Sequence, residues 1–324
     1  MTIPKPDGWS DALEALRRAE KINVACHVNP DGDALGSLFG SGLALKKMGK
    51  EVAVSWAATP LEVPFGYTFL PGQDLLTPPD ELPEADLFLA LDCGAADRLG
   101  ELEERAKATE TSINIDHHPG NDDFGTINLV VTTASSTAEL VALLLDDLGV
   151  EMDRDIATCL YTGIFTDTGS FQYTNSTPDT LRLAASLLEH DVPKSAIAQE
   201  VFETSPFGYL QLVAAVLGRA RLFEEERFIY STVTHDDLRP TGVLMEETDK
   251  LIDLLRSTRD ADVAAIFKEQ GDGSFRVSLR SKGPASVGAI ARAHGGGGHD
   301  LAAGFTTEDV DATVKAILAE LGAK

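Results

Sequence analysis

Short apolar segments alternate with helical segments through the first half of this 324-residue chain, and this alternation restricts the fold more than any other feature. Four apolar runs have the length of buried strands, at 22–26, 51–56, 86–91 and 111–115. Helical periodicity predicts helices at 10–20, 33–48 and 136–148. Strands that alternate with helices in this way indicate a parallel sheet covered on both faces. Such sheets place their functional groups at the carboxyl ends of the strands.

Capping residues mark where several helices are expected to begin. Ser10 can cap the first helix, and the sequence from Ser136 to Glu139 has the pattern of a capping box. Thr177 and Ser205 each precede a proline, a residue that suits the first position of a helix. These signals predict a helical region after the alternating half of the chain.

The pattern changes to pairs of strands after residue 218. The expected pairs are 219–223 with 228–233 and 263–269 with 274–280. A helix at 286–294, a run of glycines and a last helix from 308 follow. Because the chain is longer than an average domain, we expect two domains. The prediction is an α/β fold with a parallel-sheet domain over 1–190, a helical connection over 191–218 and a smaller α/β domain over 219–324.

The charge balance favours a small substrate over a long one. The chain has 27 basic and 52 acidic residues, which gives a formal net charge of -25. Acidity of this kind serves solubility, and it also repels polyanions, whereas proteins that track long nucleic acid are normally basic. No stretch approaches the roughly 18 apolar residues of a membrane span, and the first residues lack the apolar core of a signal peptide. We expect a cytoplasmic protein that binds neither membranes nor long nucleic acid.

Three cysteines, Cys26, Cys93 and Cys159, lie in apolar surroundings. An odd number of cysteines in such surroundings indicates reduced thiols that pack in a cytosolic protein. The absence of a Cys-x-x-Cys pair argues against a structural zinc site.

The first group of polar residues follows the strand at 22–26 and consists of His27, Asp31 and Asp33. One imidazole and two carboxylates within seven residues suit a divalent cation such as Mn²⁺ or Mg²⁺. The alternative makes Asp33 a helix N-cap and Asp31 a turn residue, but their combination with His27 favours metal binding. Asn29 and Ser37 lie nearby, and we expect them to hold the loop.

Further candidates follow the next strands. Asp92 comes directly after the third strand, and Asp116, His117 and His118 come after the fourth. Adjacent residues point to opposite sides, so we expect one histidine to face a metal and the other to act on substrate. Asp116 can orient an imidazole. Asp167 ends an apolar helical segment, where an acid is unfavourable unless a cation receives it.

Six residues are therefore candidate metal ligands: His27, Asp31, Asp33, Asp92, His117 and Asp167. This set is large enough for two metal ions that share a bridging carboxylate. Two ions about 3.5–4 Å apart can stabilise both the attacking and the leaving oxygen of a phosphoryl displacement.

These four segments, in this order, resemble the DHH phosphoesterase superfamily, which is named for the Asp-His-His found here at 116–118. The run 295–304, GGGGHDLAAG, resembles the glycine-rich signature of the DHH-associated domain. The two together, at this length, are similar to the nanoRNase/pAp phosphatase branch, which includes actinobacterial cyclic dinucleotide phosphodiesterases. The resemblance implies an active site in the cleft between the two domains, and a homodimer.

The resemblance also implies roles for the candidates. One metal would be held by His27, Asp31 and Asp92, and the second by Asp33, Asp92, His117 and Asp167. His118 would contact the scissile phosphate or protonate the leaving oxygen, with Asp92 and Asp116 completing the catalytic set. The histidine ligands favour Mn²⁺, and Mg²⁺ stays open.

The glycine run belongs to a cationic region in an otherwise acidic chain. The resemblance implies that Arg280 and His299 recognise the nucleotide. Residues beside them complete the expected substrate-binding set, namely Ser281, Gly297 and Gly298. Glycines can bring backbone N–H groups close to a phosphate. For Arg292 and His294, substrate contact and a solvated helix end are both open.

The function implied is that of a phosphoric ester hydrolase that converts short oligoribonucleotides (nanoRNA), pAp or cyclic di-AMP to mononucleotides. The sequence does not rank these substrates. An inorganic pyrophosphatase is the first alternative, but the glycine-rich C-terminal domain argues against it. A non-catalytic nucleotide sensor is the second alternative, and the complete set of candidate ligands argues against that.

Overall fold

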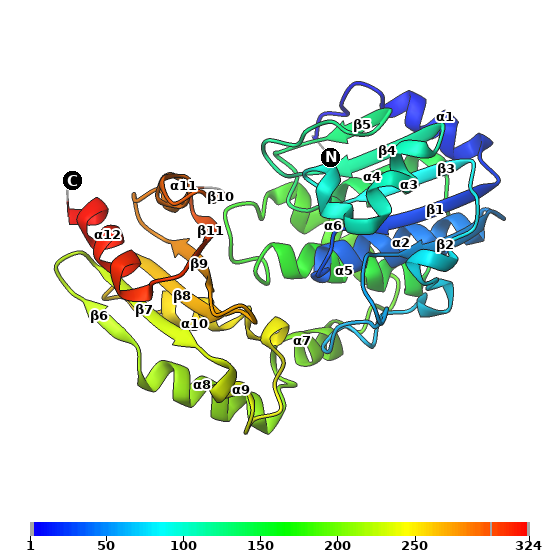
Figure 1. Cartoon of the computed structure of the whole chain (residues 1–324). Helices are drawn as coiled ribbons and strands as arrows, with labels where there is room; N and C mark the ends of the chain where they lie inside the picture. The colour runs from blue at the N-terminus through cyan, green and yellow to red at the C-terminus, as the bar shows by residue number, and fades with distance from the viewer. Residues whose placement is uncertain (1–2, 299, 323–324) are drawn as a thin grey trace. The chain divides into compact units, whose positions relative to one another are not determined.

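The computed structural model describes residues 3–298 and 300–322, and the chain divides into two compact units (Figure 1). The first unit extends to Thr204 and the second begins at Ser205. This division lies inside the segment 191–218 that we expected as a connection. Helix α7 (Lys194–Phe202) of that segment belongs to the first unit, and helix α8 (Phe207–Gly218) belongs to the second.

The first unit is built on a five-stranded parallel sheet with the order β2-β1-β3-β4-β5. Its strands are β1 (Lys21–Cys26), β2 (Glu51–Ser55), β3 (Leu87–Leu91), β4 (Thr111–Asp116) and β5 (Ile127–Val130). Val24 in the middle of β1 is in register with Val54 on one side and Leu89 on the other. The predicted parallel sheet is confirmed. The sequence does not predict β5, because this edge strand has only four residues and just one of them is buried.

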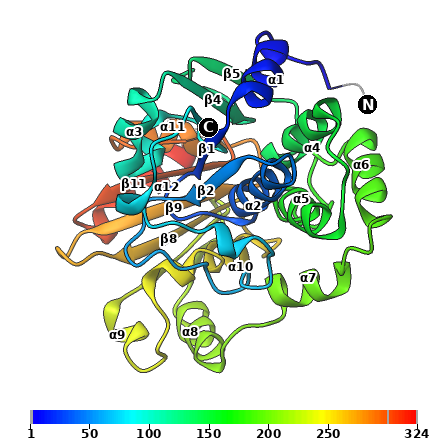
Figure 2. The ribbon, with the colours of Figure 1, turned by 90° about the vertical axis from the view of Figure 1, so that its right-hand side faces the viewer.

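Helices surround this sheet (Figures 1 and 2). They are α1 (Trp9–Arg18), α2 (Gly32–Lys47), α3 (Glu103–Ala108), α4 (Thr137–Leu148), α5 (Arg154–Asp167), α6 (Pro178–Leu188) and α7. Short 3-10 segments complete the unit: η1 (Gln73–Leu75), η2 (Pro79–Glu81) and η3 (Ala96–Leu102).

Successive strand residues contribute to two separate cores. Val24 and Leu89 lie in the larger core, which α2, α4 and α5 also fill. Their neighbours Ala25 and Ala90 lie in a smaller core with Leu99, a residue of η3. Because side chains alternate along a strand, these two cores occupy opposite faces. The prediction that both faces are covered is therefore confirmed.

Of the four predicted helix starts, three differ in detail from the structure and one, at Thr177, agrees with it. Helix α1 begins at Trp9 with Gly8 as its cap, so Ser10 lies inside the helix. Ser136 caps α4 as predicted, but the Glu139 carboxylate accepts the N–H of Ser135 at 2.7 Å, so the reciprocal bond of a capping box is replaced. Thr177 caps α6 as predicted. Helix α8 begins after Pro206, so Ser205 lies one residue too early to be its cap.

Helices α2 and α5 lie side by side and antiparallel, and glycines of α2 line their contact. Gly32, Gly36 and Gly40 occur every fourth residue, on one face of α2. A Cβ atom on Gly36 would lie 2.4 Å from the backbone oxygen of Cys159. This close approach brings the first turn of α2 next to the last turn of α5.

The second unit contains a six-stranded mixed sheet with the order β10-β11-β9-β8-β7-β6. Its strands are β6 (Arg221–Phe223), β7 (Phe228–Val233), β8 (Val263–Glu269), β9 (Phe275–Ser281), β10 (Gly297–Gly298) and β11 (Ala302–Thr307). Both predicted strand pairs, β6–β7 and β8–β9, are present and antiparallel. The β7–β8 pair is parallel.

Helices cover both faces of this second sheet as well. They are α8, α9 (His235–Leu238), α10 (Leu251–Arg256), α11 (Val287–Ala293) and α12 (Val310–Gly322), with a 3-10 segment η4 (Met245–Thr248). Residues of α8, α9 and α10 pack in one core, and residues of α11 and α12 pack in the other. The prediction of a second α/β domain is confirmed.

Two further findings bear on the sequence analysis. Cys26, Cys93 and Cys159 are free and buried, so the prediction that they pack as thiols is confirmed. Within 3–298 and 300–322, no helix combines the length and the apolar character needed to cross a membrane.

The glycine contact between α2 and α5 can be tested by substitution. Gly36→Ala is expected to lower the free energy of unfolding of the first unit by about 1–3 kcal/mol, since the backbone of α5 obstructs the new methyl group. Gly40→Ala is the matched control, because the nearest atoms to its Cβ would belong to side chains, Leu160 at 3.0 Å and Cys159 at 3.4 Å, and not to the backbone. Urea unfolding followed by tryptophan fluorescence reports on this unit, which contains both Trp9 and Trp56. Equal losses in both variants would contradict a backbone-limited contact.

Candidate metal centre

The candidate residues of the first unit meet at the carboxyl edge of its sheet, where the strand order reverses direction. The chain passes from β1 to β2 on one side and returns to β3 on the other. His27 follows β1, Asp92 follows β3 and His117 follows β4, while Asp33 lies in the first turn of α2 and Asp167 ends α5. Open α/β sheets form their ligand sites at this kind of position.

His27, Asp31 and Asp92 form one group, with one ligand atom from each lying within 4.8 Å of the others. His27 Nε2 is 3.5 Å from Asp92 Oδ2 and 4.0 Å from Asp31 Oδ1. The other ring nitrogen, Nδ1, lies 2.8 Å from the carbonyl oxygen of Val28. Because a carbonyl oxygen only accepts, Nδ1 carries a proton, and Nε2 is the ring nitrogen that faces the carboxylates.

Asp31 also caps helix α2. Its Oδ1 accepts the N–H groups of Asp33 and Ala34, both at 3.0 Å. The alternative interpretation of the sequence predicted Asp33 as the helix N-cap and Asp31 as a turn residue. This assignment was wrong, because Asp31 is the N-cap. Capping and a place in the cluster are compatible, since one carboxylate offers several lone pairs.

Asp33, His117 and Asp167 form a second group within 4.8 Å. His117 Nε2 lies 3.8 Å from Asp33 Oδ2 and 3.7 Å from Asp167 Oδ2. Asp33 is 1% exposed, and its two oxygens accept the N–H groups of Thr137 at 2.7 Å and Ala138 at 2.9 Å. The Asp33 carboxylate thus binds the N-terminus of α4.

Asp92 lies between the two groups. Its Oδ2 is 3.5 Å from His27 Nε2, and its Oδ1 is 3.7 Å from His117 Nε2. The hydroxyl of Thr137 donates to the same Oδ1 at 3.0 Å. Asp92 has a φ of 59°, a left-handed backbone conformation that costs about 1–2 kcal/mol for an L-residue. Strain of this kind is concentrated at functional sites.

The two adjacent histidines do not point to opposite sides as we expected. Their rings lie 4.7 Å apart, and both approach Asp92, with His118 Nδ1 at 3.5 Å from Asp92 Oδ1. The strand β4 ends at Asp116, so the alternation of a strand no longer applies to the two residues that follow.

His118 forms a separate hydrogen bond with Asp116. Its Nδ1 donates to Asp116 Oδ1 at 2.8 Å, and Asn121 Nδ2 donates to the other oxygen, Oδ2, at 2.6 Å. The hydrogen bond to Asp116 raises the pKa of His118 to about 9, and the charge of Asp92 adds to this effect while burial opposes it. His118 therefore carries a positive charge at neutral pH.

The carboxylates crowd one another in this cluster. Burial, together with the charges of Asp31 and Asp92, raises the pKa of Asp167 to about 6, although His117 opposes the shift. Burial also raises the pKa of Asp33 well above its usual range, with Asp92 and Asp167 adding to the shift. For Asp92, burial favours a higher pKa, but the hydrogen bond and charge of His27, with the charges of His117 and His118, together lower the pKa. The acidic and histidine side chains of this cluster can hold a metal ion.

The described substrate candidates of the second unit lie on β9 and β10, two strands that β11 separates. Arg280 on β9 is in register with Ala302 on β11, and Gly298 on β10 is in register with Ala303. Gly297 and Gly298 are exposed, and Gly298 has a φ of 128° that only glycine adopts readily. Ser281 is 1% exposed, and its hydroxyl donates to the carbonyl oxygen of Gly283. His299 lies outside the described residues.

For Arg292 and His294, the sequence left open either contact with the substrate or a solvated helix end. Both side chains contact other parts of the second unit. Arg292 Nη1 donates to the carbonyl oxygen of Gly298 at 3.3 Å and so contacts the glycine run itself. His294 stacks on Phe305 with ring centres 4.7 Å apart, and its Nε2 is 3.3 Å from a carboxylate oxygen of Glu320. These contacts hold the end of α11 against the sheet and α12.

Sequence reasoning missed residues that hold the cluster in place. Thr137 lies in the predicted capping segment, and its position next to a helix start was an available signal. Asn121 supports Asp116 from five residues away, and Arg98 approaches His27. Neither has a sequence pattern that reveals its partner, because each contact depends on how a loop folds back.

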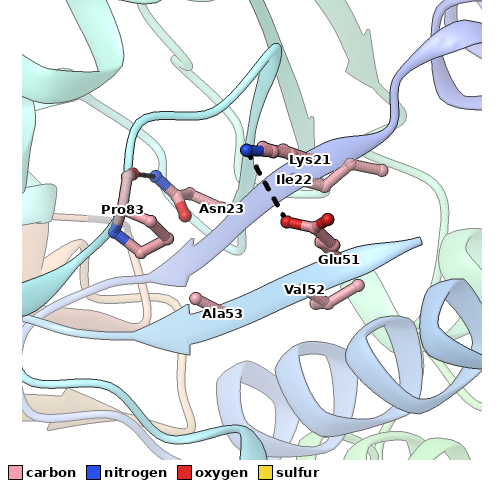
Figure 3. A pocket seen from close by; sticks show the side chains of 7 residues that line it. All are labelled: Lys21, Ile22, Asn23, Glu51, Val52, Ala53 and Pro83. Carbon is pink, nitrogen blue, oxygen red and sulfur yellow. Dashed lines mark hydrogen bonds and ion pairs between the residues drawn. The ribbon is translucent and has the colours of Figure 1, made fainter.

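A pocket at the other end of the sheet has different properties. It lies at the amino ends of β1 and β2, has a volume of about 90 Å³ and is lined in part by Lys21, Asn23 and Pro83 (Figure 3). Asn23 donates to the carbonyl oxygen of Pro83, while its own oxygen has no partner among the described residues. Pockets for nucleotide-sized ligands measure about 300–1,000 Å³, so this pocket is of a size for ordered water.

Known proteins resemble this chain over nearly its whole length. The DHH family, N-terminal domain, matches residues 21–164, and the DHHA1 domain matches residues 225–323. The bifunctional oligoribonuclease and PAP phosphatase NrnA of Thermus thermophilus is 35% identical over 313 residues, which cover 95% of this chain and 92% of that protein. The protein of the same name from Bacillus subtilis is 30% identical over 315 residues, covering 96% and 97%.

Solved structures agree with this relationship. An exopolyphosphatase-related protein from Bacteroides fragilis has a TM-score of 0.90 at 26% identity, and the match covers 99% of this chain and 97% of that one. RecJ of Thermus thermophilus in complex with Mn²⁺ shares the fold, with a TM-score of 0.59 at 18% identity, over 98% of this chain and 56% of that one. The chain therefore belongs to the DHH family, and a DHHA1 domain follows its DHH domain.

Proposed function

We propose that this protein hydrolyses phosphate ester bonds of short nucleotides and that the cluster around Asp92 holds two divalent metal ions. The observation that carries the proposal is the overlap of two acid–histidine groups at one carboxylate. His27 and Asp31 approach Asp92 from one side, and His117 approaches it from the other.

The ligand sets follow from these groups. His27, Asp31 and Asp92 would hold one ion, and Asp33, His117, Asp167 and Asp92 would hold the second. The fit is supported by the donors themselves, since His27 Nε2 faces the carboxylates, and burial together with neighbouring negative charge raises the pKa values of Asp33 and Asp167. Mixed oxygen and imidazole donors favour Mn²⁺, with Mg²⁺ as the alternative.

Bound metal ions of this kind supply Lewis acidity and lower the pKa of a water molecule. The chain's own residues supply proton transfer and orientation. His118 is positively charged and held by Asp116, so it can donate a hydrogen bond to the phosphate or a proton to the leaving oxygen. Asn121 fixes Asp116, and so the ring orientation of His118 is fixed as well.

The proposed substrates are nanoRNA, pAp and cyclic di-AMP. The names of the Thermus thermophilus and Bacillus subtilis relatives support the first two. The net charge of -25 disfavours long RNA. Arg280, Ser281, Gly297, Gly298 and His299 are the proposed nucleotide-binding residues, and the exposure of the two glycines supports this assignment.

Two broader properties belong to the same proposal. A cytoplasmic location is supported by the three free, buried cysteines. A homodimer is supported by the family resemblance and is checked by sedimentation of the purified protein.

A substrate panel tests the proposed function. With Mn²⁺ or Mg²⁺ present, we expect hydrolysis of pApA, pAp or cyclic di-AMP, and a rate per RNA end that falls steeply beyond a few nucleotides. Preferred hydrolysis of pyrophosphate would instead support the first alternative, an inorganic pyrophosphatase. Nucleotide binding without hydrolysis of any member would support a sensor.

The division of roles between the adjacent histidines is a second prediction. His117→Ala should lower the bound metal content, because His117 lies between three aspartates. His118→Ala should keep the metal and lower kcat by roughly 10²–10³-fold, since it removes a proton donor. Elemental analysis beside kinetics measures both, with the exposed His235→Ala as the control. Equal metal loss in both variants would show that the roles are not divided.

Metal binding should depend on pH. The pKa of Asp167 is about 6, above its ordinary 3.8, so the metal-free fold holds this proton more tightly than the unfolded chain does. The associated stability is present below about pH 4 and is lost as the pH rises through about 6. Because a ligand must lose its proton, metal affinity should rise over that interval.

Calorimetry in two buffers of different ionisation enthalpy measures this proton release. Proton release on metal binding should be clear near about pH 5.5 and smaller near about pH 7.5, because Asp167 loses its proton between these values. Asp167→Asn should reduce the release at the lower pH. Proton release that is independent of pH would contradict the assignment.

A further inference from the structure

Arg98 lies in η3, directly after β3, and its guanidinium reaches the cluster. Arg98 Nη2 is 3.3 Å from His27 Nδ1. The backbone of Arg98 is held in place as well, because its carbonyl oxygen accepts the N–H of Val28 at 2.8 Å. The arginine is therefore fixed beside the segment that carries His27 and Asp31.

The contact with His27 is not a hydrogen bond. His27 Nδ1 donates its proton to the Val28 carbonyl oxygen at 2.8 Å, so it has no lone pair to offer. A guanidinium has five N–H donors and no acceptor, which makes the pair two donors facing each other. The donors of Arg98 at this place are consequently available to an acceptor that arrives from solution.

The described part of the chain does not supply a carboxylate for that purpose. Arg98 is exposed, and no acidic side chain among residues 3–298 and 300–322 forms an ion pair with it. Nearby acids are engaged elsewhere: Asp31 caps α2, and Asp116 accepts from His118 and Asn121.

Arg98 is a positively charged residue at an edge of the sheet where, histidines apart, the other charged residues of the connecting segments are acidic. Five segments follow the strands at the carboxyl edge, 27–31, 56–72, 92–102, 117–126 and 131–136, and Arg98 is their one arginine or lysine. The same segments contain seven acidic residues, Asp31, Glu62, Asp92, Asp97, Glu101, Asp122 and Asp123. Other cations of the unit, such as Lys21 and Lys50, lie at the amino ends of the strands.

We propose that Arg98 binds a non-bridging oxygen of the phosphate group that reacts at the cluster. An arginine is always charged and its planar donors match phosphate geometry, so it lowers the cost of bringing an anion to an acidic edge. Arg98 thereby acts on the phosphate itself. It differs from Arg280, whose proposed role concerns the rest of the nucleotide. This inference rests on the proposed phosphoesterase function.

The test compares Arg98→Ala and the similarly shaped Arg98→Gln with the intact protein. Both should keep the metal content and bind inorganic phosphate at least roughly tenfold more weakly by calorimetry, since a charge-assisted bond is lost. Turnover of pApA and of bis(p-nitrophenyl) phosphate should fall by a similar factor, roughly 10²-fold, because both present the reacting phosphate. Guanidinium ion added to Arg98→Ala should restore part of the activity, which a purely structural role would not permit.

Arg18→Ala is the matched control. It removes the same charge from an exposed side chain at the end of α1 and should leave all four measurements unchanged. Unchanged phosphate affinity in Arg98→Ala would overturn the inference. So would a loss of metal, or a loss of pApA turnover with normal turnover of the small diester. If the intact protein hydrolyses no phosphate ester, the proposed function fails, whereas phosphate binding still tests Arg98 separately.

Discussion

The first unit depends on the contact between the Asp33 carboxylate and the N-terminus of α4. The carboxylate extends from the first turn of α2 and accepts the buried N–H groups of Thr137 and Ala138 at the start of α4. The positive end of α4 thus neutralises part of a charge that is almost fully buried. Thr137 in turn donates to Asp92, so one helix start positions two acids of the cluster. A packed interior alone would not stabilise these charges.

The opposite effect operates at the end of α5. Asp167 lies at the negative end of that helix and faces Asp33 across the glycine-lined contact with α2. Its pKa is raised to about 6 as a result of burial and of neighbouring acids. The fold therefore keeps together negative charges that only partly find positive partners within the chain. Such an arrangement is costly for stability, and it favours a cation that arrives from solution.

Much of this site was predictable from the sequence because topology determines which segments meet. In a parallel sheet, every residue that directly follows a strand lies at the same edge. His27, Asp92 and His117 could be placed there from the strand pattern alone. The short edge strand β5 was missed, since its four residues give a weak pattern. The adjacent histidines were misjudged because β4 ends one residue before them.

What the sequence determined by itself was the set of candidate residues and the edge of the sheet on which they lie. The tertiary structure alone decided the partners that lie far apart in the sequence: Asp33 with the start of α4, Asp92 with Thr137, and Arg98 beside His27. The physical reason is the range of the interactions. Hydrophobic periodicity is local and can be read along the chain. A hydrogen bond between segments remote in sequence forms only when the donor–acceptor distance is correct to within a few tenths of an ångström.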